Sequence, residues 1–180
     1  MNPVLMEKDA LIDEMMARER QRKFIPEAER RPYGEYAWEK GRKTAARIQQ
    51  QHPGRTAMQI AEEMGLKIEE KDGPGFNLSE YTSGQKRITL FPNTIQSDFI
   101  DAEAEHLATT DYAEVRQLFL AHELFHHLEC TDPAVGITYR ERQVVVFSAG
   151  PFKWKTGLRC LSEIAAHSFA LQLAGASVLR

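Results

Sequence analysis

The sequence has few cysteines, no long apolar run and no strong excess of charge, and each shortage excludes a class of protein. Cys130 and Cys160 are the only cysteines in 180 residues. Two are too few for a secreted disulfide scaffold, so we expect a reducing, cytoplasmic compartment. Residues 1–14 lack the apolar core of a signal peptide. No stretch reaches the roughly 20 apolar residues that span a bilayer, and we expect no membrane partner.

The charge balance is slightly acidic, with a net charge of −3 and a pI near 6.1. Such a balance gives no general attraction to polyanions, so direct nucleic-acid binding is not expected. Residues 58–66 could begin a DNA-binding helix-turn-helix. However, residues 67–71 alternate like a strand where a recognition helix should follow, which favours helix-turn-strand instead.

Hydrophobic periodicity predicts an α+β fold in which a small antiparallel or mixed sheet packs against a buried helix and further helices. We expect helices at residues 4–23, 36–51, 56–64, 113–130 and 158–173, and strands at 66–70, 86–91 and 143–147. The first strand should end at the turn 72–75, the third at Gly150-Pro151, and residues 97–110 form a short helix or a loop.

The N-terminal part is interpreted as separate from the main domain. Pro26, Pro32 and Gly34 interrupt a charged stretch and indicate a linker or an arm lying on the surface. Residues 1–35 are therefore expected to form a helical arm or linker, and residues 36–180 the main domain. The Met15/Met16 stripe of the arm either packs on the domain or offers a docking surface.

Residues 122–126 read His-Glu-Leu-Phe-His and carry the main functional signal. His122 and His126 are one helical turn apart, so both imidazoles can reach one metal ion. Glu123 lies about a quarter-turn away and can act as general base on the water that the metal holds. The surrounding helix is apolar on nearly every side, so these polar groups need a partner such as a cation.

A third ligand should come from a second helix packed against the first. Glu163 shares a helical face with Ala166, His167 and Ala170, and the alanines would allow the two helices to approach closely. His52 and His106 fall in expected loops, outside any ligand motif. His167 could replace Glu163 as ligand, hydrogen-bond to it, or stabilise an oxyanion; the last two are favoured.

Two further side chains near the motif are not expected to bind metal. His127 points about 140° from His122 on a helical wheel. Cys130 follows His126 by one turn and could approach the ion, but a small buried apolar side chain is the favoured interpretation.

The motif helix, followed by a Glu163-x-x-Ala166-x-x-Phe169-Ala170 helix, resembles the ImmA/IrrE-type metallopeptidases. The strand at residues 88–90 and the element at 60–66 are also similar to that family's layout, over residues 40 to 175. The resemblance implies a zincin-like core with His122, His126 and Glu163 as zinc ligands and Glu123 as catalytic base. The chain departs from the family's pattern at Phe125 and at His167, and it lacks the Leu-Met-Pro ending that often follows the last helix of that family.

These observations lead to the hypothesis of a zinc-dependent endopeptidase that cleaves a protein or peptide. The resemblance further implies a bacterial or mobile-element protein whose substrate is a regulatory protein such as a DNA-binding repressor. Tyr139, Arg140 and His167 are the candidate oxyanion donors. An extended substrate could pair with a sheet edge at residues 144–147. Iron, manganese or cobalt would also suit two histidines and a carboxylate. The alternatives are a zinc-containing module that binds a repressor or toxin without cutting it, and a metal-free, inactive remnant.

Overall fold

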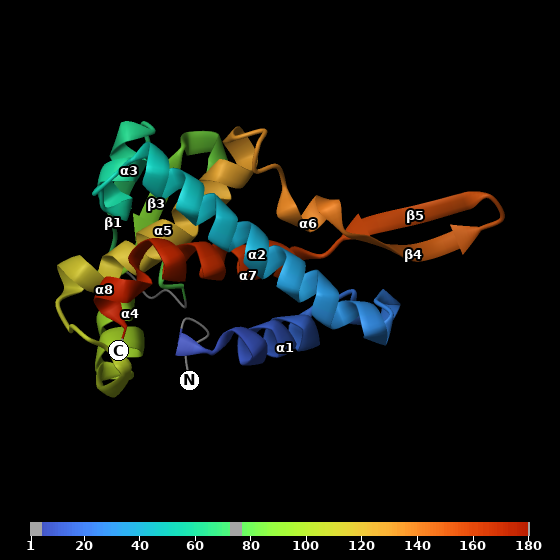
Figure 1. Cartoon of the computed structure of the whole chain (residues 1–180), viewed down its shortest axis with the longest axis horizontal. Coiled ribbons are helices and arrows are strands. Elements are labelled where there is room, and N and C mark those ends of the chain that lie inside the picture. Colours follow the sequence, from blue (N-terminus) through green and yellow to red (C-terminus); the bar gives the residue numbers. More distant parts are fainter. Residues whose placement is uncertain (1–4, 73–76, 180) are drawn as a thin grey trace.

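The computed structural model describes residues 5–72 and 77–179 and has an α+β architecture (Figure 1). Its long helices are α1 (Lys8–Arg18), α2 (Glu27–Gln51), α5 (Tyr112–Thr131) and α7 (Arg159–Ala170). The shorter helical segments are η2 (Arg22–Phe24), α3 (Ala57–Glu63), η3 (Ser83–Gln85), α4 (Pro92–Ile95), η4 (Gln96–Asp101), η5 (Ala104–His106), α6 (Thr138–Glu141), η6 (Leu171–Gly175) and α8 (Ala176–Val178). The expected start of a helix at residue 4 and most of the turn at 72–75 lie outside the described residues.

The N-terminal part is not a linker, because α2 runs without interruption through Pro32 and across the expected boundary between residues 35 and 36. Pro32 removes one helical hydrogen bond, but tertiary packing holds the helix together. Gly34 is a contact point: a Cβ there would lie 2.3 Å from Ile12 Cγ2 of α1. Arg31 of α2 forms ion pairs with Asp9 and Asp13 of α1.

Helix α1 packs on its own domain. Its apolar stripe is therefore not available as a docking surface for a partner. Leu11 and Ile12 are fully buried, and Met16 is 3% exposed. The Met16 sulfur lies 3.8 Å from Cys160 Sγ of α7, and Glu19 accepts a hydrogen bond from the Cys160 amide. The helix is shorter than the expected 4–23.

The strongest helical pattern was predicted to within one residue at each end: α5 covers Tyr112–Thr131 against an expected 113–130. Its first turn is capped by Asp111, whose carboxylate accepts a hydrogen bond from the Ala113 amide. Thr56 caps α3 as expected, in a reciprocal capping box with Gln59. Gly65, at φ +74°, follows that helix in the left-handed conformation that favours glycine.

A three-stranded mixed sheet lies beside α5. It consists of β1 (Lys67–Glu70), β2 (Ser79–Thr82) and β3 (Arg87–Leu90) in the order β1-β3-β2. β1 and β3 are parallel, whereas β2 and β3 are antiparallel. β1 and β3 match two predicted strands; β2 was not predicted, and it forms one edge of the sheet.

The third predicted strand belongs to a separate two-stranded hairpin. β4 (Gln143–Ala149) pairs antiparallel with β5 (Phe152–Gly157) around Gly150-Pro151, so the expected stop is the turn of a ribbon. Gly150 adopts φ +57°, which allows this tight reversal. The hairpin projects from the helical body, to the right in Figure 1. Among the described residues, no helix combines the length and apolar character needed to cross a membrane.

Helices α2 and α7 approach each other closely at Gly41. A Cβ at this position would lie 2.0 Å from the carbonyl oxygen of Ala165, so only glycine fits. Helix α7 is almost wholly buried and packs against α5 on its other side. The Gly41 contact therefore sets how closely α7 lies to α2, and α7 in turn packs on α5, which carries the histidines.

We expect Gly41→Ala to lower the free energy of unfolding by about 1–3 kcal/mol, although alanine is the better helix former, because the added methyl must displace the α7 backbone. Urea unfolding followed by circular dichroism measures this loss. Gln50→Ala, on the exposed side of α2, is the control and should change stability by less than about 0.5 kcal/mol. Equal stability of the two variants would contradict the close helix contact.

Candidate metal centre

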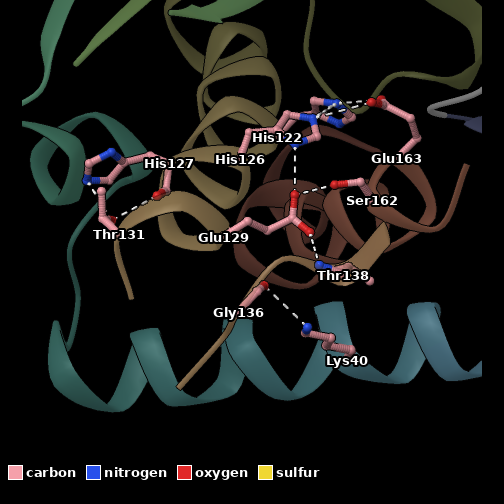
Figure 2. A network of polar contacts seen from close by, with 10 residues as sticks. All are labelled: Lys40, His122, His126, His127, Glu129, Thr131, Gly136, Thr138, Ser162 and Glu163. Atoms are coloured by element: carbon pink, nitrogen blue, oxygen red, sulfur yellow. Dashed lines mark hydrogen bonds and ion pairs between the residues drawn. The ribbon is translucent and has the colours of Figure 1, made fainter. Parts of the chain in front are cut away.

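Helices α5 and α7 bring three potential metal ligands together. His122 Nε2 lies 3.2 Å from His126 Nε2 and 3.4 Å from Glu163 Oε2, and His126 Nε2 lies 3.7 Å from Glu163 Oε1. Two imidazoles and one carboxylate thus face a common point (Figure 2). Among the described residues, no other set of three His, Cys, Asp or Glu side chains converges in this way.

These separations fit a tetrahedral zinc site. Zinc bonds of about 2.0–2.1 Å to nitrogen or oxygen place adjacent ligand atoms about 3.3 Å apart. The histidine nitrogens are 3.2 Å apart, and each lies 3.4 or 3.7 Å from a different oxygen of Glu163, which is the range of this spacing. The donor set suits zinc and also accepts iron, manganese or cobalt. Three protein ligands leave a fourth position for water or substrate, as catalytic zinc sites require.

Glu129, which sequence reasoning missed, orients one of the ligands. Its Oε2 lies 3.4 Å from His126 Nδ1, one turn further along α5. When Nδ1 carries the ring proton, it donates a hydrogen bond to Glu129. The lone pair of Nε2 is then free to face the metal position. The i, i+3 spacing of His126 and Glu129 is the signal in the sequence that could have revealed this pair.

Glu129 is 6% exposed, and its charge is balanced by hydrogen bonds from three segments of the chain. The Thr138 amide donates to Oε1 at 2.9 Å, and the Ser162 hydroxyl of α7 donates to Oε2 (Figure 2). Burial would raise the pKa of Glu129, but the hydrogen bonds from His126, Ser162 and Thr138 outweigh it and lower the pKa. The carboxylate is therefore ionised beside His126.

The charges of the candidate ligands and of Glu129 stabilise one another. Burial disfavours the charged form of His126, yet the Glu129 hydrogen bond and the nearby carboxylates raise its pKa to about 8. Burial likewise disfavours the Glu163 carboxylate, but the neighbouring imidazoles lower its pKa to about 2. Glu163 is thus an anion at neutral pH, which is the form that binds metal.

Glu123 is held beside this cluster by a strand that was not predicted. It is 6% exposed, and its Oε1 accepts a hydrogen bond of 2.7 Å from the Ser79 hydroxyl of β2. Ser79 carries no local signal in the sequence, because its role depends on the pairing of β2 with β3. Its hydroxyl fixes the direction of the Glu123 carboxylate.

A cavity of about 560 Å³ joins these groups. One wall is formed by residues 77–81 of β2 and its approach, and the opposite wall by α5 and α7. His122, Glu123, His126 and Glu163 all line it. A cavity of this size accommodates several residues of an extended peptide or a small molecule.

His167 lies in the cavity wall and is not part of the converging ligand set. Its ring centroid is 4.8 Å from that of His122, in an edge-on arrangement. The side chain is buried, and this burial, together with His122, lowers its pKa to about 3. A neutral imidazole in this place keeps one N–H that it can donate into the cavity.

The other two candidate oxyanion donors lie elsewhere. Tyr139 and Arg140 belong to α6 and do not line the cavity. Arg140 Nε instead donates to the Tyr139 hydroxyl at 3.3 Å, and the Tyr139 carbonyl accepts from the Leu158 amide. The sequence offered no spacing that ties this short helix to the motif, so their distance from the metal position could not be predicted.

His127 faces away from the ligand cluster, as the helical wheel predicted (Figure 2). Its Nδ1 forms a hydrogen bond of 2.8 Å with the Tyr81 hydroxyl of β2, and its Nε2 lies 3.4 Å from Thr131 Oγ1. Burial, with a contribution from Lys86, lowers its pKa. The interpretation of Cys130 as a buried apolar side chain is wrong, because its position at the end of α5 is exposed.

His52 and His106 also lie outside the cavity. His52 contacts Glu63 at 2.7 Å, and His106 lies 3.5 Å from Glu105.

Comparisons of the chain with protein-family models, with curated proteins and with solved structures each give no match. The geometry of the site and the motif therefore carry the functional argument alone.

We expect Glu129→Gln to weaken zinc binding by about 10- to 100-fold, because the amide no longer holds the His126 ring with a full negative charge. Competition with a chromogenic chelator measures the affinity, and circular dichroism checks that the fold is intact. Glu114→Gln, at an exposed position of the same helix, is the matched control and should bind zinc like the unmodified protein. Equal affinities of the two variants would show that Glu129 does not support a ligand.

Proposed function

We propose that the protein is a zinc-dependent endopeptidase of the ImmA/IrrE type. The observation that supports this most strongly is the convergence of His122, His126 and Glu163 in one cavity with Glu123 beside them. His122, His126 and Glu123 belong to one helix, and Glu163 comes from a second. This is the arrangement that hydrolysis of a peptide bond at a three-ligand zinc site requires.

A zinc ion held by these three side chains would supply Lewis-acid activation of water and of the scissile carbonyl. Glu123 acts as the general base: it accepts a proton from the attacking water and passes it to the departing amine. The Ser79 hydroxyl binds one oxygen of the Glu123 carboxylate, and this carboxylate lines the cavity beside the three candidate ligands. His167 donates its N–H to the developing oxyanion.

The open edge of β2 is the proposed binding site for an extended substrate, in place of the edge at residues 144–147. β4 pairs with β5 in the separate hairpin and does not line the cavity, whereas β2 does. The Leu78 carbonyl accepts from the Phe91 amide and so points toward β3. In a regular antiparallel strand, the backbone groups of Ser79 and Tyr81 therefore face the open edge, where a peptide can pair with them.

Two polar contacts set the position of this edge relative to the metal ligands. Ser79 bonds to Glu123, and Tyr81, two residues along the strand, bonds to His127, one turn along α5. Both contacts can form at once, because two residues of a strand and one turn of a helix cover similar lengths. Tyr81 acts here as a positioning residue.

The proposed substrate is a protein or peptide, such as a DNA-binding repressor, which is the kind of regulatory protein that the family resemblance implies. We place the activity in the cytoplasm of a bacterium or in a mobile element's host, and the two free cysteines are compatible with a reducing compartment. Zinc is the proposed metal because the distances between the candidate ligand atoms are near those that zinc bond lengths impose in a tetrahedral site.

Glu123→Gln should retain zinc and lose cleavage by at least about 100-fold, because the amide cannot accept the proton from water. Elemental analysis measures the metal, and mass spectrometry of a proteome-derived peptide library measures cleavage. Glu114→Gln is the isosteric control at an exposed position of the same helix. Persistent cleavage by the Glu123 variant would remove the assigned base.

The same assay separates the enzyme from a metal-containing module that only binds its partner. A zinc-loaded, unmodified protein that cleaves no peptide of the library, but forms a stable complex with a repressor by intact-mass analysis, would contradict the proposed peptidase. A purified protein that binds no divalent metal would contradict both functions.

Tyr81→Phe should raise KM for a cleaved library peptide by roughly fivefold and leave kcat and zinc content nearly unchanged, because one hydrogen bond that holds the substrate-binding edge is lost. Tyr112→Phe is the control: it also removes a hydroxyl that bonds to another element, Glu70 of β1, but away from the cavity. A loss of kcat without a change in KM would contradict the positioning role of Tyr81.

A further inference from the structure

The β4–β5 hairpin exposes large apolar side chains, a feature that the proposed peptidase does not use. Phe147 and Phe152 are each 58% exposed, and Trp154 is 61% exposed. They lie on a ribbon that projects from the body next to α6 (Figure 1), and the strands contact α6 and η2. Nothing in the described fold covers these rings.

The strand register places the three aromatic rings on one face of the hairpin. Phe147 pairs with Trp154, and Phe152 lies two residues before Trp154 on the same strand. Cross-strand partners share a face, and so do alternate residues. Lys153 and Lys155 alternate with the rings and therefore point to the other face.

The charge of the hairpin is of one sign and increases with distance from the tip. Residues 143–152 carry no charged side chain, and residues 142–162 contain no Asp or Glu. Lys153 and Lys155 are exposed, and neither has an ion-pair partner among the described residues. An uncharged tip is thus followed by a stretch in which aromatic rings alternate with lysines, on a protein whose net charge is −3.

The area of the aromatic face is small for a protein interface. Three rings that are about three-fifths exposed offer roughly 350 Å². A stable protein–protein contact, including one with a second copy of this chain, buries about 800 Å² on each partner. Insertion of a few aromatic side chains into a lipid interface needs no such area, provided that cations meet anionic headgroups.

Single-stranded nucleic acid fits the arrangement less well. Stacked bases bring their phosphates toward cations that surround the rings. Here the lysines point to the opposite face, and the tip has no charge. In a hairpin that enters a membrane tip first, long lysine side chains on either face extend back to the headgroup phosphates, and Trp154 lies at the interface.

We propose that the hairpin is a peripheral docking element for an anionic lipid surface. The tip, residues 148–151, enters between headgroups; Phe147 and Phe152 reach the boundary with the acyl chains; and Lys153 and Lys155 bind lipid phosphates. This docking element lies on the membrane surface and does not span it. A long apolar run in the sequence indicates only a membrane-spanning segment, so the absence of such a run does not bear on the hairpin. It is also independent of the metal centre and of any peptidase activity.

Co-sedimentation with vesicles tests the proposal. The full chain should bind vesicles of equal parts phosphatidylglycerol and phosphatidylcholine and bind pure phosphatidylcholine vesicles far more weakly. Replacing Phe147, Phe152 and Trp154 together with serine should weaken binding on the order of 100-fold. Lys153→Gln with Lys155→Gln should weaken it roughly thirtyfold, and added salt should weaken it further.

A matched control is Lys43→Gln with Lys71→Gln, which changes the net charge equally at exposed lysines of α2 and of the segment after β1. It should alter vesicle binding less than twofold. In a Trp38→Phe background, Trp154 is the only tryptophan, and its emission should move to shorter wavelength on binding. Circular dichroism verifies that each variant is folded.

Several outcomes would overturn the proposal. They are no vesicle binding by the unmodified chain, and equal binding by the hairpin and control lysine variants. The proposal would also be overturned if the chain bound no vesicles and instead bound a single-stranded oligonucleotide, and the aromatic variant lost that binding. The same holds if the chain bound no vesicles and self-associated in sedimentation velocity, and the aromatic variant lost that self-association. Any of these results leaves the metal centre and the peptidase assay unaffected, so the two proposals fail separately.

Discussion

The close packing of three helices is the constraint on which the site depends. Gly41 lets the backbone of α2 lie against Ala165 of α7, and α7 in turn packs on α5. From α7, the Glu163 carboxylate lies 3.4 Å from His122 and 3.7 Å from His126 of α5. Glu129 reinforces the same contact from within, because its buried charge is balanced by Ser162 of α7 and by His126. Packing and electrostatics therefore place the ligands together.

The part of the site that the sequence predicts is the part that helical periodicity governs. The spacing of His122, Glu123 and His126 fixes their directions once a helix is assumed, and α5 is strongly periodic. Glu163 could be predicted because small residues on its face indicate a close helix neighbour. Glu129 shares the same helix as the histidines, but its role depends on burial and on donors from distant segments, which no local pattern contains.

The strands show where local reasoning fails. β2 has a half-buried, largely polar sequence, so it is a strand only because it pairs with β3, and Ser79 reaches Glu123 for that reason. β5 was missed because Gly150-Pro151 was interpreted as an end and not as a turn. Pro32 and Gly34 were interpreted as breaks, yet contacts with α1 hold α2 straight through them. In each case, tertiary contacts override the local signal.

The division of the ligands between α5 and α7 has a consequence for folding. A cation coordinated by His126 and Glu163 cross-links two helices and closes the intervening chain, α6 and the whole hairpin, into a loop. A cation that binds only the folded arrangement would stabilise the native state by mass action, because the unfolded chain does not hold the three side chains together. Metal affinity and thermodynamic stability would then be linked, so a higher free metal concentration would raise the free energy of unfolding.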